Sequence, residues 1–368
     1  MNMNLYSPTA RQSEIVDNRR DRPSNHQVQS RSKREQTATV NSESSEAILA
    51  KFYGPVRSEL QSVEQQLNTE LSSPYPELQQ LLRHGTQLGG KRLRPAMVLL
   101  FGHACGHLTP RHQTIATVVE MVHTATLIHD DVLDGANERR HVPTINAQWN
   151  AHTSILVGDY LFSQAYRLAA TTHCTTACEK VGEAARRVCE GELRQVLHRD
   201  HISLDEITYL SMLQAKTGEL CRVACELGAR FSGASEAEIT AAARFGNSLG
   251  IAFQIADDYL DLWGDDQLVG KTLGTDLEQG KTTLPIIRLL ETASAIDRLQ
   301  IQKILEGPAA NRAEQLLPML EKSDAQAYTR SVARQHHSDA ILALEPIGEG
   351  EAKRCLKTIA DFSIDRRF

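Results

Sequence analysis

The sequence predicts an all-α protein, and three observations lead to that fold class. The 368 residues are rich in residue types that favour helix, whereas aromatic residues make up only 5%. Apolar residues recur three and four positions apart through most of the chain, which is the period of an α-helix. No segment shows the apolar–polar alternation of a half-exposed strand. We therefore expect ten or more helices packed as one bundle.

The predicted helices follow one another from Ala47 onward, with glycine and proline between them. Nine segments have the helical spacing, namely residues 60–71, 78–88, 96–105, 115–133, 155–170, 177–197, 207–231, 239–262 and 285–290. The predicted breaks are residues 73–76, 89–90, 108–110, 232–233, 264–280 and 307–308. We expect this helical domain to cover residues 46–368.

Residues 1–45 differ from the rest of the chain. They are polar, rich in Ser, Asn, Gln and Arg, and nearly free of apolar periodicity, so we expect a disordered extension. The segment lacks the apolar core of a secretory signal. Its Arg- and Ser-rich composition is also found in organelle transit peptides, but Glu14, Asp17, Asp21 and Glu35 argue against that interpretation.

Charge and cysteine content exclude several classes of protein. The net charge of −6 is too small to indicate a nucleic-acid partner or a strongly charged membrane surface. No apolar run approaches the roughly 18–20 residues that span a bilayer, so we expect a soluble, cytoplasmic protein. The seven cysteines do not form a disulfide framework by their number or spacing. Cys174 and Cys178, near His173, are conceivable soft-metal ligands, but small apolar residues on helix faces explain them better.

Two aspartate clusters of the form DDxxD are the most informative motifs. Each follows an apolar, helix-like stretch, and residues four apart lie on nearly the same face of a helix. Carboxylates in apolar surroundings are costly unless a cation neutralises them, which points to a hard divalent metal such as Mg²⁺. The clusters contain Asp130, Asp131, Asp134, Asp257, Asp258 and Asp261.

Basic residues accompany both aspartate clusters in glycine-containing segments. They are Lys91 and Arg94 in residues 89–95, Arg139 and Arg140, and Lys271 and Lys281 in residues 270–281. A diphosphate fits this pattern, because its oxygens bridge Mg²⁺ while Lys and Arg neutralise the remaining charge. Surface salt bridges are the simpler alternative, but exposed pairs contribute only about 0–1 kcal/mol and need no glycine hinges. A nucleotide enzyme is disfavoured because no P-loop motif occurs.

From about Ala47 to Phe368, the chain resembles the trans-isoprenyl diphosphate (polyprenyl) synthases, most of all the long-chain members. The matching motifs are GKRLRP at 90–95, LIHDDVLD at 127–134, Arg139-Arg140, GDYL at 158–161, EGE at 190–192, KTG at 216–218, FQIADD at 253–258 and the segment 270–281. The resemblance implies an isoprenoid-synthase-type helical bundle around a central cavity. It also implies a homodimer, and allylic and isopentenyl diphosphates as substrates.

The resemblance also implies roles for individual residues. Asp130, Asp134 and Asp257 match Mg²⁺ ligands, with Asp131, Asp258 and Asp261 supporting them. The residues that match the allylic diphosphate site are Arg139, Lys216, Lys271 and Lys281. Those that match the isopentenyl diphosphate site are Lys91, Arg94, His123 and Arg140. Thr217 and Gln254 match residues that face the reacting allyl group. His129 is expected to be structural, and His141 stands where many relatives carry glycine.

Product length depends, in this family, on side chains upstream of the first aspartate. A bulky aromatic residue four or five positions before Asp130 accompanies short products, whereas this chain has the small residues Ala125 and Thr126. The first DDxxD also lacks an insertion that some short-chain members have. We therefore expect a long polyprenyl chain, hexaprenyl to decaprenyl, of the kind used in quinone side chains. The product's apolar tail leaves transient membrane contact open.

Four alternatives remain at this point. A short-chain synthase making geranylgeranyl or farnesyl diphosphate differs in product size. A terpene cyclase of the same fold usually lacks the second set of basic residues, and a non-catalytic partner subunit usually lacks an aspartate cluster. A helical scaffold would bind no diphosphate at all.

Overall fold

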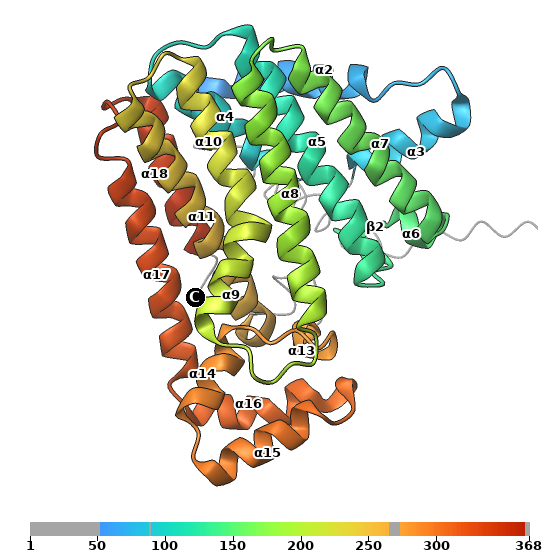
Figure 1. Cartoon of the computed structure of the whole chain (residues 1–368), viewed down its shortest axis with the longest axis vertical. Coiled ribbons are helices and arrows are strands. Elements are labelled where there is room, and N and C mark those ends of the chain that lie inside the picture. The colour runs from blue at the N-terminus through green and yellow to red at the C-terminus, as the bar shows by residue number, and fades with distance from the viewer. Residues whose placement is uncertain (1–51, 88–89, 265–272, 365–368) are drawn as a thin grey trace, which may run out of the picture. The chain divides into compact units, whose positions relative to one another are not determined.

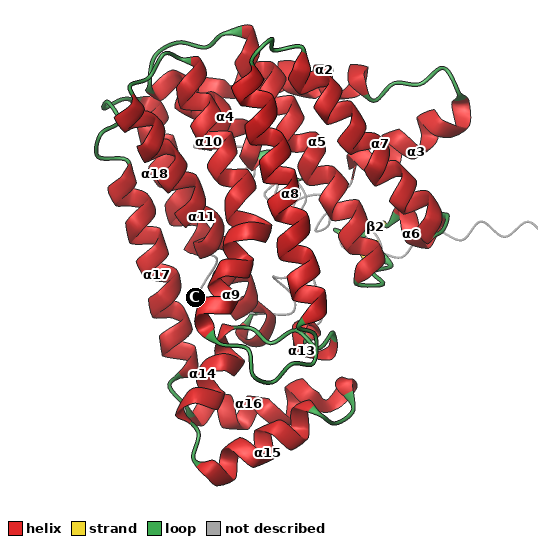
Figure 2. Cartoon of the chain, viewed as in Figure 1, coloured by secondary structure: helices red, strands yellow, loops and turns green. Residues whose placement is uncertain are grey.

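The computed structural model describes residues 52–87, 90–264 and 273–364. Helices dominate this part of the chain, and its strands form a single short pair, which confirms the predicted all-α class (Figure 2). The described residues belong to one compact unit. The N-terminal extension predicted for residues 1–45 lies outside the described residues.

The elements follow in the order that Figure 1 labels. They are η1 (Gly54–Val56), α2 (Arg57–Glu70), α3 (Pro76–Gln87), α4 (Leu93–Ala104), α5 (Pro110–Leu133), β1 (Glu138–Arg139), β2 (Val142–Pro143), α6 (Ile145–Gln148), α7 (Ala151–Ala170), α8 (Thr175–Leu197), α9 (Glu206–Leu213), η2 (Gln214–Gly218), α10 (Glu219–Phe231), α11 (Glu236–Trp263), α13 (Thr275–Glu278), α14 (Leu284–Thr292), α15 (Ala295–Leu305), η3 (Ala309–Asn311), α16 (Arg312–Lys322), α17 (Ala325–Ala343) and α18 (Glu351–Ile364). None of these helices is both long and apolar enough to cross a bilayer.

Local sequence signals set the starts of the two helices that carry the aspartate clusters. Pro110 occupies the first turn of α5, where its missing N–H costs nothing. The preceding Thr109 and the ring of His112 form a reciprocal cap. At the start of α11, Ser235 and Glu238 form a capping box, with the Ser235 N–H donating to Glu238 Oε2 at 2.8 Å. Both helices then run without interruption to their aspartates.

The main core lies among the long helices. Helix α11 packs on α10 and α17, and α5 packs on α7 and α4. Phe101 of α4 and Phe245 of α11 meet edge to face with ring centroids 5.4 Å apart, and both are fully buried. A second apolar cluster, which includes Leu289, Ile301 and Leu316, joins α14, α15 and α16 at the lower end of the bundle (Figure 1).

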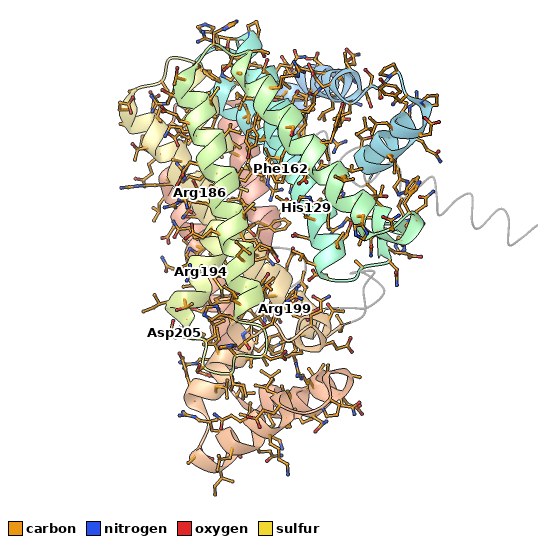
Figure 3. All side chains as sticks on the ribbon, turned by 45° about the vertical axis from the view of Figure 1, so that its right-hand side comes forward. His129, Phe162, Arg186, Arg194, Arg199 and Asp205 are labelled. Atoms are coloured by element: carbon orange, nitrogen blue, oxygen red, sulfur yellow. The ribbon has the colours of Figure 1, made fainter. Side chains whose placement is uncertain are left out.

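Helix α7 lies beside the end of α5 and next to α8 (Figure 3). His129 of α5 faces α7, where its Nε2 donates to the Ile155 carbonyl oxygen at 3.1 Å and its ring lies 5.9 Å from Phe162. These contacts fit the structural role expected for His129. On the next pair of helices, a Cβ added to Gly191 of α8 would lie 2.8 Å from the Lys216 backbone nitrogen, so only glycine permits this approach.

The structure differs from the sequence-based prediction in several places. Helix α13 lies within the predicted break at 264–280, and α15 to α18 lie beyond the nine predicted segments. The segment predicted as one helix at 207–231 contains η2, a π-helical turn, between α9 and α10. Extra residues of this kind occur mostly at functional sites. In addition, β1 and β2 form a hairpin whose two central residues, Arg140 and His141, have φ of 54° and 63°. Such a turn favours glycine or asparagine, so Arg140 and His141 adopt a backbone conformation that is unfavourable for their residue types.

Candidate active site

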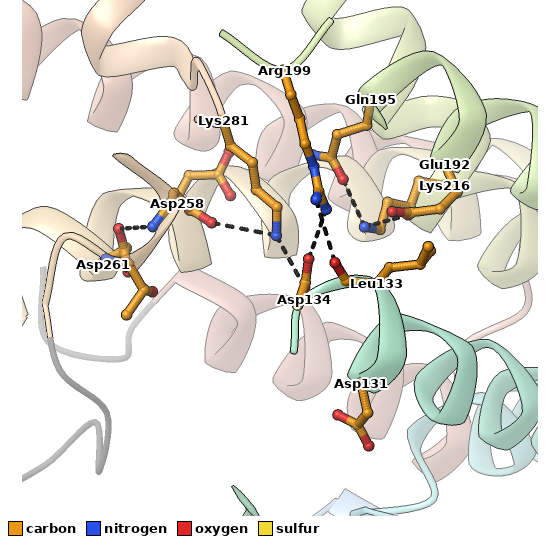
Figure 4. Close-up of polar contacts among 12 residues, drawn as sticks. Asp131, Leu133, Asp134, Glu192, Gln195, Arg199, Lys216, Asp258, Asp261 and Lys281 are labelled. Carbon is orange, nitrogen blue, oxygen red and sulfur yellow. Dashed lines mark hydrogen bonds and ion pairs between the residues drawn. The ribbon is translucent and has the colours of Figure 1, made fainter. Parts of the chain in front are cut away.

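The two aspartate clusters lie at the C-terminal ends of α5 and α11 (Figure 4). Lys281 connects them. Its Nζ lies 3.1 Å from Asp134 Oδ2 and 3.9 Å from Asp276 Oδ1. The backbone nitrogen of Asp276 in turn donates to Asp261 Oδ2 at 3.1 Å. The ammonium group of Lys281 therefore lies between the two acidic helix ends.

Each aspartate of the first cluster has a different environment. Burial raises the pKa of Asp130 to about 6, and nearby Lys216 opposes that shift. Asp131 is buried, and its Oδ1 accepts from Arg139 Nε at 2.9 Å. Asp134, the residue directly after α5, accepts from Arg199 Nη2 at 2.9 Å and from Lys281. The cluster therefore draws basic side chains from several separate segments.

The aspartates of the second cluster accept hydrogen bonds from α9, from α11 itself and from the start of α13. Asp258 accepts from Tyr209 Oη at 2.6 Å and from Gln254 Nε2 at 3.0 Å, and burial raises its pKa to about 6. Asp261 accepts from the N–H and hydroxyl of Thr275, at 3.1 and 2.6 Å, and thereby fixes the start of α13. Asp257 lies half-buried on the same helix end. These contacts agree with supporting roles for Asp258 and Asp261.

The π-helical turn carries Lys216 and Thr217 to the same place. Lys216 Nζ lies 2.5 Å from Glu192 Oε2 and 2.8 Å from Gln195 Oε1, both on α8. The Thr217 hydroxyl donates to Gln254 Oε1 at 3.1 Å. Because Gln254 also donates to the second cluster, the amide is fixed at both ends. This chain of contacts orients Gln254 before any ligand binds.

A group of arginines surrounds His123 on α5. Burial lowers the pKa of His123 well below its ordinary value, and the positive charges of Arg94, Arg139, Arg140 and Arg92 add to that effect. His123 is therefore neutral at neutral pH. An anion bound among these arginines would relieve their mutual repulsion, which fits the predicted second diphosphate site.

Lys91 and Arg94 of that predicted site lie at the start of α4, and Arg140 lies in the turn between β1 and β2. The Arg140 guanidinium packs so closely on Gly90 that a Cβ there would lie 2.4 Å from its Nη2. Lys91 is exposed, and its Nζ lies 4.5 Å from the centre of the Phe362 ring on α18. Arg92 is different, since it pairs with Glu120 at 2.6 Å and with Glu64 and serves the scaffold.

Three predicted residues remain. Lys271 lies outside the described residues. Ala125 is fully buried in the main core, and the Thr126 hydroxyl donates to the His123 carbonyl oxygen at 2.8 Å. Both are small side chains on the helix that leads to Asp130.

Sequence reasoning missed three residues that contact the aspartates: Arg199, Tyr209 and Asp276. Arg199 follows the end of α8, and Tyr209 lies on α9 as an ordinary core residue. Asp276 lies in α13, where burial raises its pKa to about 8 and Asp258 and Asp261 add to the shift. Arg199 and Tyr209 belong to no local motif, and Asp276 lies in the segment 270–281 without a local signal that distinguishes it, so only their three-dimensional neighbours reveal them.

The chemistry of the donor set fits a divalent cation shared with a ligand. The groups that line the two helix ends are carboxylates, which hard cations prefer, and burial raises the pKa of several of them. Among the described residues, however, no three acidic, His or Cys side chains converge into a closed metal cage. Mg²⁺ usually keeps several waters and binds through one or two carboxylates plus substrate phosphates. The arrangement therefore fits Mg²⁺ that is completed by a diphosphate.

Comparison with known proteins places this geometry in a family. The chain is 33% identical over 313 residues to the geranyl-diphosphate-specific all-trans-nonaprenyl-diphosphate synthase of Rhodobacter capsulatus, covering 85% of this chain and 96% of that one. It is also 33% identical over 308 residues to the short chain isoprenyl diphosphate synthase of Methanothermobacter thermautotrophicus, covering 82% and 95%.

A solved structure supports the same assignment. The polyprenyl synthase of Caulobacter crescentus, complexed with calcium and isoprenyl diphosphate, superposes with a TM-score of 0.81 at 31% identity, covering 87% of this chain and 98% of that one. The family model described as polyprenyl synthetase matches residues 75–321. The chain therefore belongs to the polyprenyl synthetase family of prenyltransferases.

Proposed function

We propose that this chain is a Mg²⁺-dependent synthase that condenses an allylic diphosphate with successive isopentenyl diphosphates into a long all-trans polyprenyl diphosphate. The observation that carries the proposal is the gathering of carboxylates and basic side chains between the ends of α5 and α11. The nonaprenyl synthase of R. capsulatus supports a long product for this chain as well.

The residues near the aspartates would hold the allylic diphosphate. Asp130, Asp134 and Asp257 would bind Mg²⁺, which supplies charge neutralisation and a template for the diphosphate oxygens. Lys281 already contacts Asp134 and Lys216 pairs with Glu192, so phosphate oxygens would exchange places with these present partners. Lys271, predicted for the same role, completes the proposed set. This cluster of cations favours departure of the diphosphate because it stabilises the charge that develops on it.

The residues next to the reacting carbon atoms would stabilise the condensation step. The allylic C–O bond breaks with its electron pair going to the diphosphate, and the double bond of isopentenyl diphosphate forms the new C–C bond. The fixed oxygens of Gln254 and Thr217 present dipoles to the allylic cation. A proton then leaves the new carbon chain for the departing diphosphate, which is the nearest strong base in this scheme.

The second substrate would bind among the arginines around His123. Lys91, Arg94 and Arg140 would contact the isopentenyl diphosphate, and His123 would donate a hydrogen bond as a neutral imidazole. A neutral histidine is suited to this position, because it adds no repulsion to the surrounding guanidinium groups. The double bond of the bound substrate would then face the allylic site.

Product length would depend on the space beside α5. Ala125 is buried one turn and more before Asp130, and no large side chain fills that position. A growing chain that passes this point would meet the next residues of the helix, Met121 and Val122, only after several additions. We therefore place the product between hexaprenyl and decaprenyl, as expected for a quinone side chain.

We also propose a homodimer. Exposed apolar side chains gather on α7 and α8, including Leu156 at 67%, Leu193 at 64% and Leu197 at 69% exposure. The two helices lie next to each other, so these residues form a shared apolar band. A second copy of the chain would cover it, and size-exclusion chromatography with light scattering tests this point. The band is also the surface where transient membrane contact during product release would be sought.

One assay tests the proposed activity. Purified protein is incubated with Mg²⁺, labelled isopentenyl diphosphate and farnesyl diphosphate, and the products are sized by chromatography. We expect a long polyprenyl diphosphate, and no product from an Asp257→Asn variant, which removes a charge with little change of shape. Products that stop at geranylgeranyl diphosphate would support the short-chain alternative, for which the M. thermautotrophicus relative is a precedent. No condensation at all would contradict the proposal.

A further inference from the structure

Arg199 occupies a position between the two ends of the site that no sequence motif marks. It lies in the loop after α8, and its Nη2 donates to Asp134 Oδ1 at 2.9 Å (Figure 4). Its Nη1 donates to the Leu133 carbonyl oxygen at 3.3 Å. Its Nε is buried without a hydrogen-bond partner among the described residues. The guanidinium therefore has unused donor capacity directly beside the first aspartate cluster.

Asp134 holds two cations at once. Arg199 contacts one carboxylate oxygen and Lys281 contacts the other, at 2.9 and 3.1 Å. One carboxylate therefore contacts two cations at once, and Lys216, whose pKa is raised in part by Asp134, is a third basic residue near this carboxylate. Three basic residues from three separate segments thus border the place where the proposed allylic diphosphate binds.

A clamp of hydrogen bonds around Asp200, whose side chain is exposed, links the two loops that supply Arg199 and Lys281. The Asp200 N–H donates to the Gly280 carbonyl oxygen at 2.9 Å. Arg199 directly precedes Asp200 in the chain, and Lys281 directly follows Gly280, so this hydrogen bond brings the two basic residues together. The Asp200 carboxylate also lies against Gly280, where a Cβ would come within 2.6 Å of Oδ1. Gly280 has φ of 72°, which favours glycine.

Arg312, at the start of α16, completes this clamp. Its Nη1 donates to Asp200 Oδ1 at 2.8 Å and to the Leu277 carbonyl oxygen at 3.2 Å. The side chain is only 10% exposed. Burying an arginine costs folding free energy, because its charge must be desolvated, and well-placed hydrogen bonds are needed to offset that cost. Arg312 therefore helps to fix the distance between the loop of Asp200 and the loop of Gly280. The residues adjacent to these two, Arg199 and Lys281, both contact the Asp134 carboxylate.

We propose that Arg199 binds the diphosphate of the allylic substrate, and that Arg312 is a positioning residue that acts through Asp200 and Gly280. Before substrate binds, Asp134 holds Arg199 and Lys281 in place. With a metal-bound diphosphate in the site, Asp134 would help to hold the metal, and Arg199 and Lys281 would bind phosphate oxygens instead. This inference rests on the proposed function and adds to it a further diphosphate ligand, Arg199, and the clamp that positions it.

The test compares Arg199→Gln and Arg199→Lys with a matched control, Arg194→Gln, which changes an arginine one turn earlier on α8. Two quantities are measured: KM for farnesyl and isopentenyl diphosphates, and the binding of inorganic pyrophosphate with Mg²⁺ by calorimetry. A charge-assisted hydrogen bond is worth a factor of about ten or more in affinity. Arg199→Gln should therefore raise KM for farnesyl diphosphate and weaken pyrophosphate binding by at least about tenfold. The KM for isopentenyl diphosphate should change little, Arg199→Lys should restore part of the loss, and Arg194→Gln should resemble the unchanged protein.

The positioning role of Arg312 has its own test. Arg312→Gln should raise KM for farnesyl diphosphate in the parent protein but add little in the Arg199→Gln background, since both act through one contact. Thermal unfolding of each variant separates this effect from loss of the fold, and Arg312→Lys provides a milder substitution. An additive effect in the double variant would overturn the positioning role.

The outcomes also separate this inference from the proposed function. If the parent protein condenses prenyl diphosphates and Arg199→Gln leaves both KM and pyrophosphate binding unchanged, Arg199 is not a ligand and the inference fails alone. If the parent protein makes no prenyl product but Arg199→Gln still weakens pyrophosphate binding, the proposed function fails while the diphosphate site stands.

Discussion

Replacing Gly191 by alanine should damage catalysis far more than folding. Gly191 lets α8 lie directly against the π-helical turn, where an added Cβ would lie 2.8 Å from the Lys216 nitrogen and 3.0 Å from the Ala215 Cβ. The nearest atom belongs to the backbone and cannot rotate away. The helices must therefore separate, and α8 also carries Glu192 and Gln195, the partners of Lys216.

The two effects have different magnitudes. Overpacking costs about 1–3 kcal/mol, whereas alanine gains about 1 kcal/mol over glycine within a helix. The net loss of stability is therefore about 0–2 kcal/mol, or a few degrees in Tm. A shift of Lys216 by a fraction of an ångström to about 1 Å, in contrast, can reduce turnover by on the order of 100-fold.

The assay measures Tm and turnover with farnesyl and isopentenyl diphosphates for Gly191→Ala and for Gly182→Ala. Gly182 lies on the same helix, but nothing lies within 4 Å of its added Cβ. Gly182→Ala should therefore keep full turnover and gain up to about 1 kcal/mol in stability. Full turnover in Gly191→Ala would refute the argument that this contact positions Lys216.

Three further predictions follow from the structure. Ala125→Phe should shorten the product, because Ala125 is buried on the helix beside which we propose that the product runs, and an unchanged product size in chromatography would remove Ala125 from the length argument. Asp130→Ala should reduce turnover by several orders of magnitude with little change in Tm, and chelation of Mg²⁺ with EDTA should do the same. Adding Mg²⁺ back to the chelated protein should restore turnover, which is the control. Wild-type turnover in the Asp130→Ala variant would contradict the metal role. Burial lowers the pKa of His112, whose Nε2 donates to the Gly228 carbonyl oxygen at 2.9 Å, so the unfolded chain takes up this proton at higher pH than the folded one. Stability should therefore fall as pH drops from about 7.5 to about 5.5, and the fall in the urea midpoint should be smaller in His112→Gln, whereas an equal fall would exclude His112 as a cause.

The sequence predicted those parts of the site that local patterns determine. Asp130 and Asp258 end long amphipathic helices, and the starts of those helices have proline and capping signals that can be recognised in one dimension. The glycine-flanked basic residue Lys281 was also recognisable by its neighbours. These features depend on residues a few positions apart, which is the range in which helical periodicity and capping operate.

The parts that were missed depend on contacts between distant segments. Arg199 meets Asp134 only because the loop after α8 is held against Gly280, 80 positions along the chain from Asp200. The π-helical turn was missed because apolar spacing of three or four residues tolerates one extra residue. The hairpin was missed because strands of two residues show no alternation, and because Arg140 lacks the usual preference for positive φ.

The extra residue in η2 also sets the rotation of α9 relative to α10 about their common helical axis. Helix α9 directs Tyr209 toward Asp258, while α10 enters the bundle core, and a continuous α-helix would not hold both orientations. If the same residues instead formed an uninterrupted α-helix, the extra residue would rotate everything on one side by roughly 100° relative to the other. Tyr209 would then point away from the acidic end of α11. The one extra residue in η2 thus determines how α9, which contacts the acidic end of α11, is oriented relative to α10 in the bundle core.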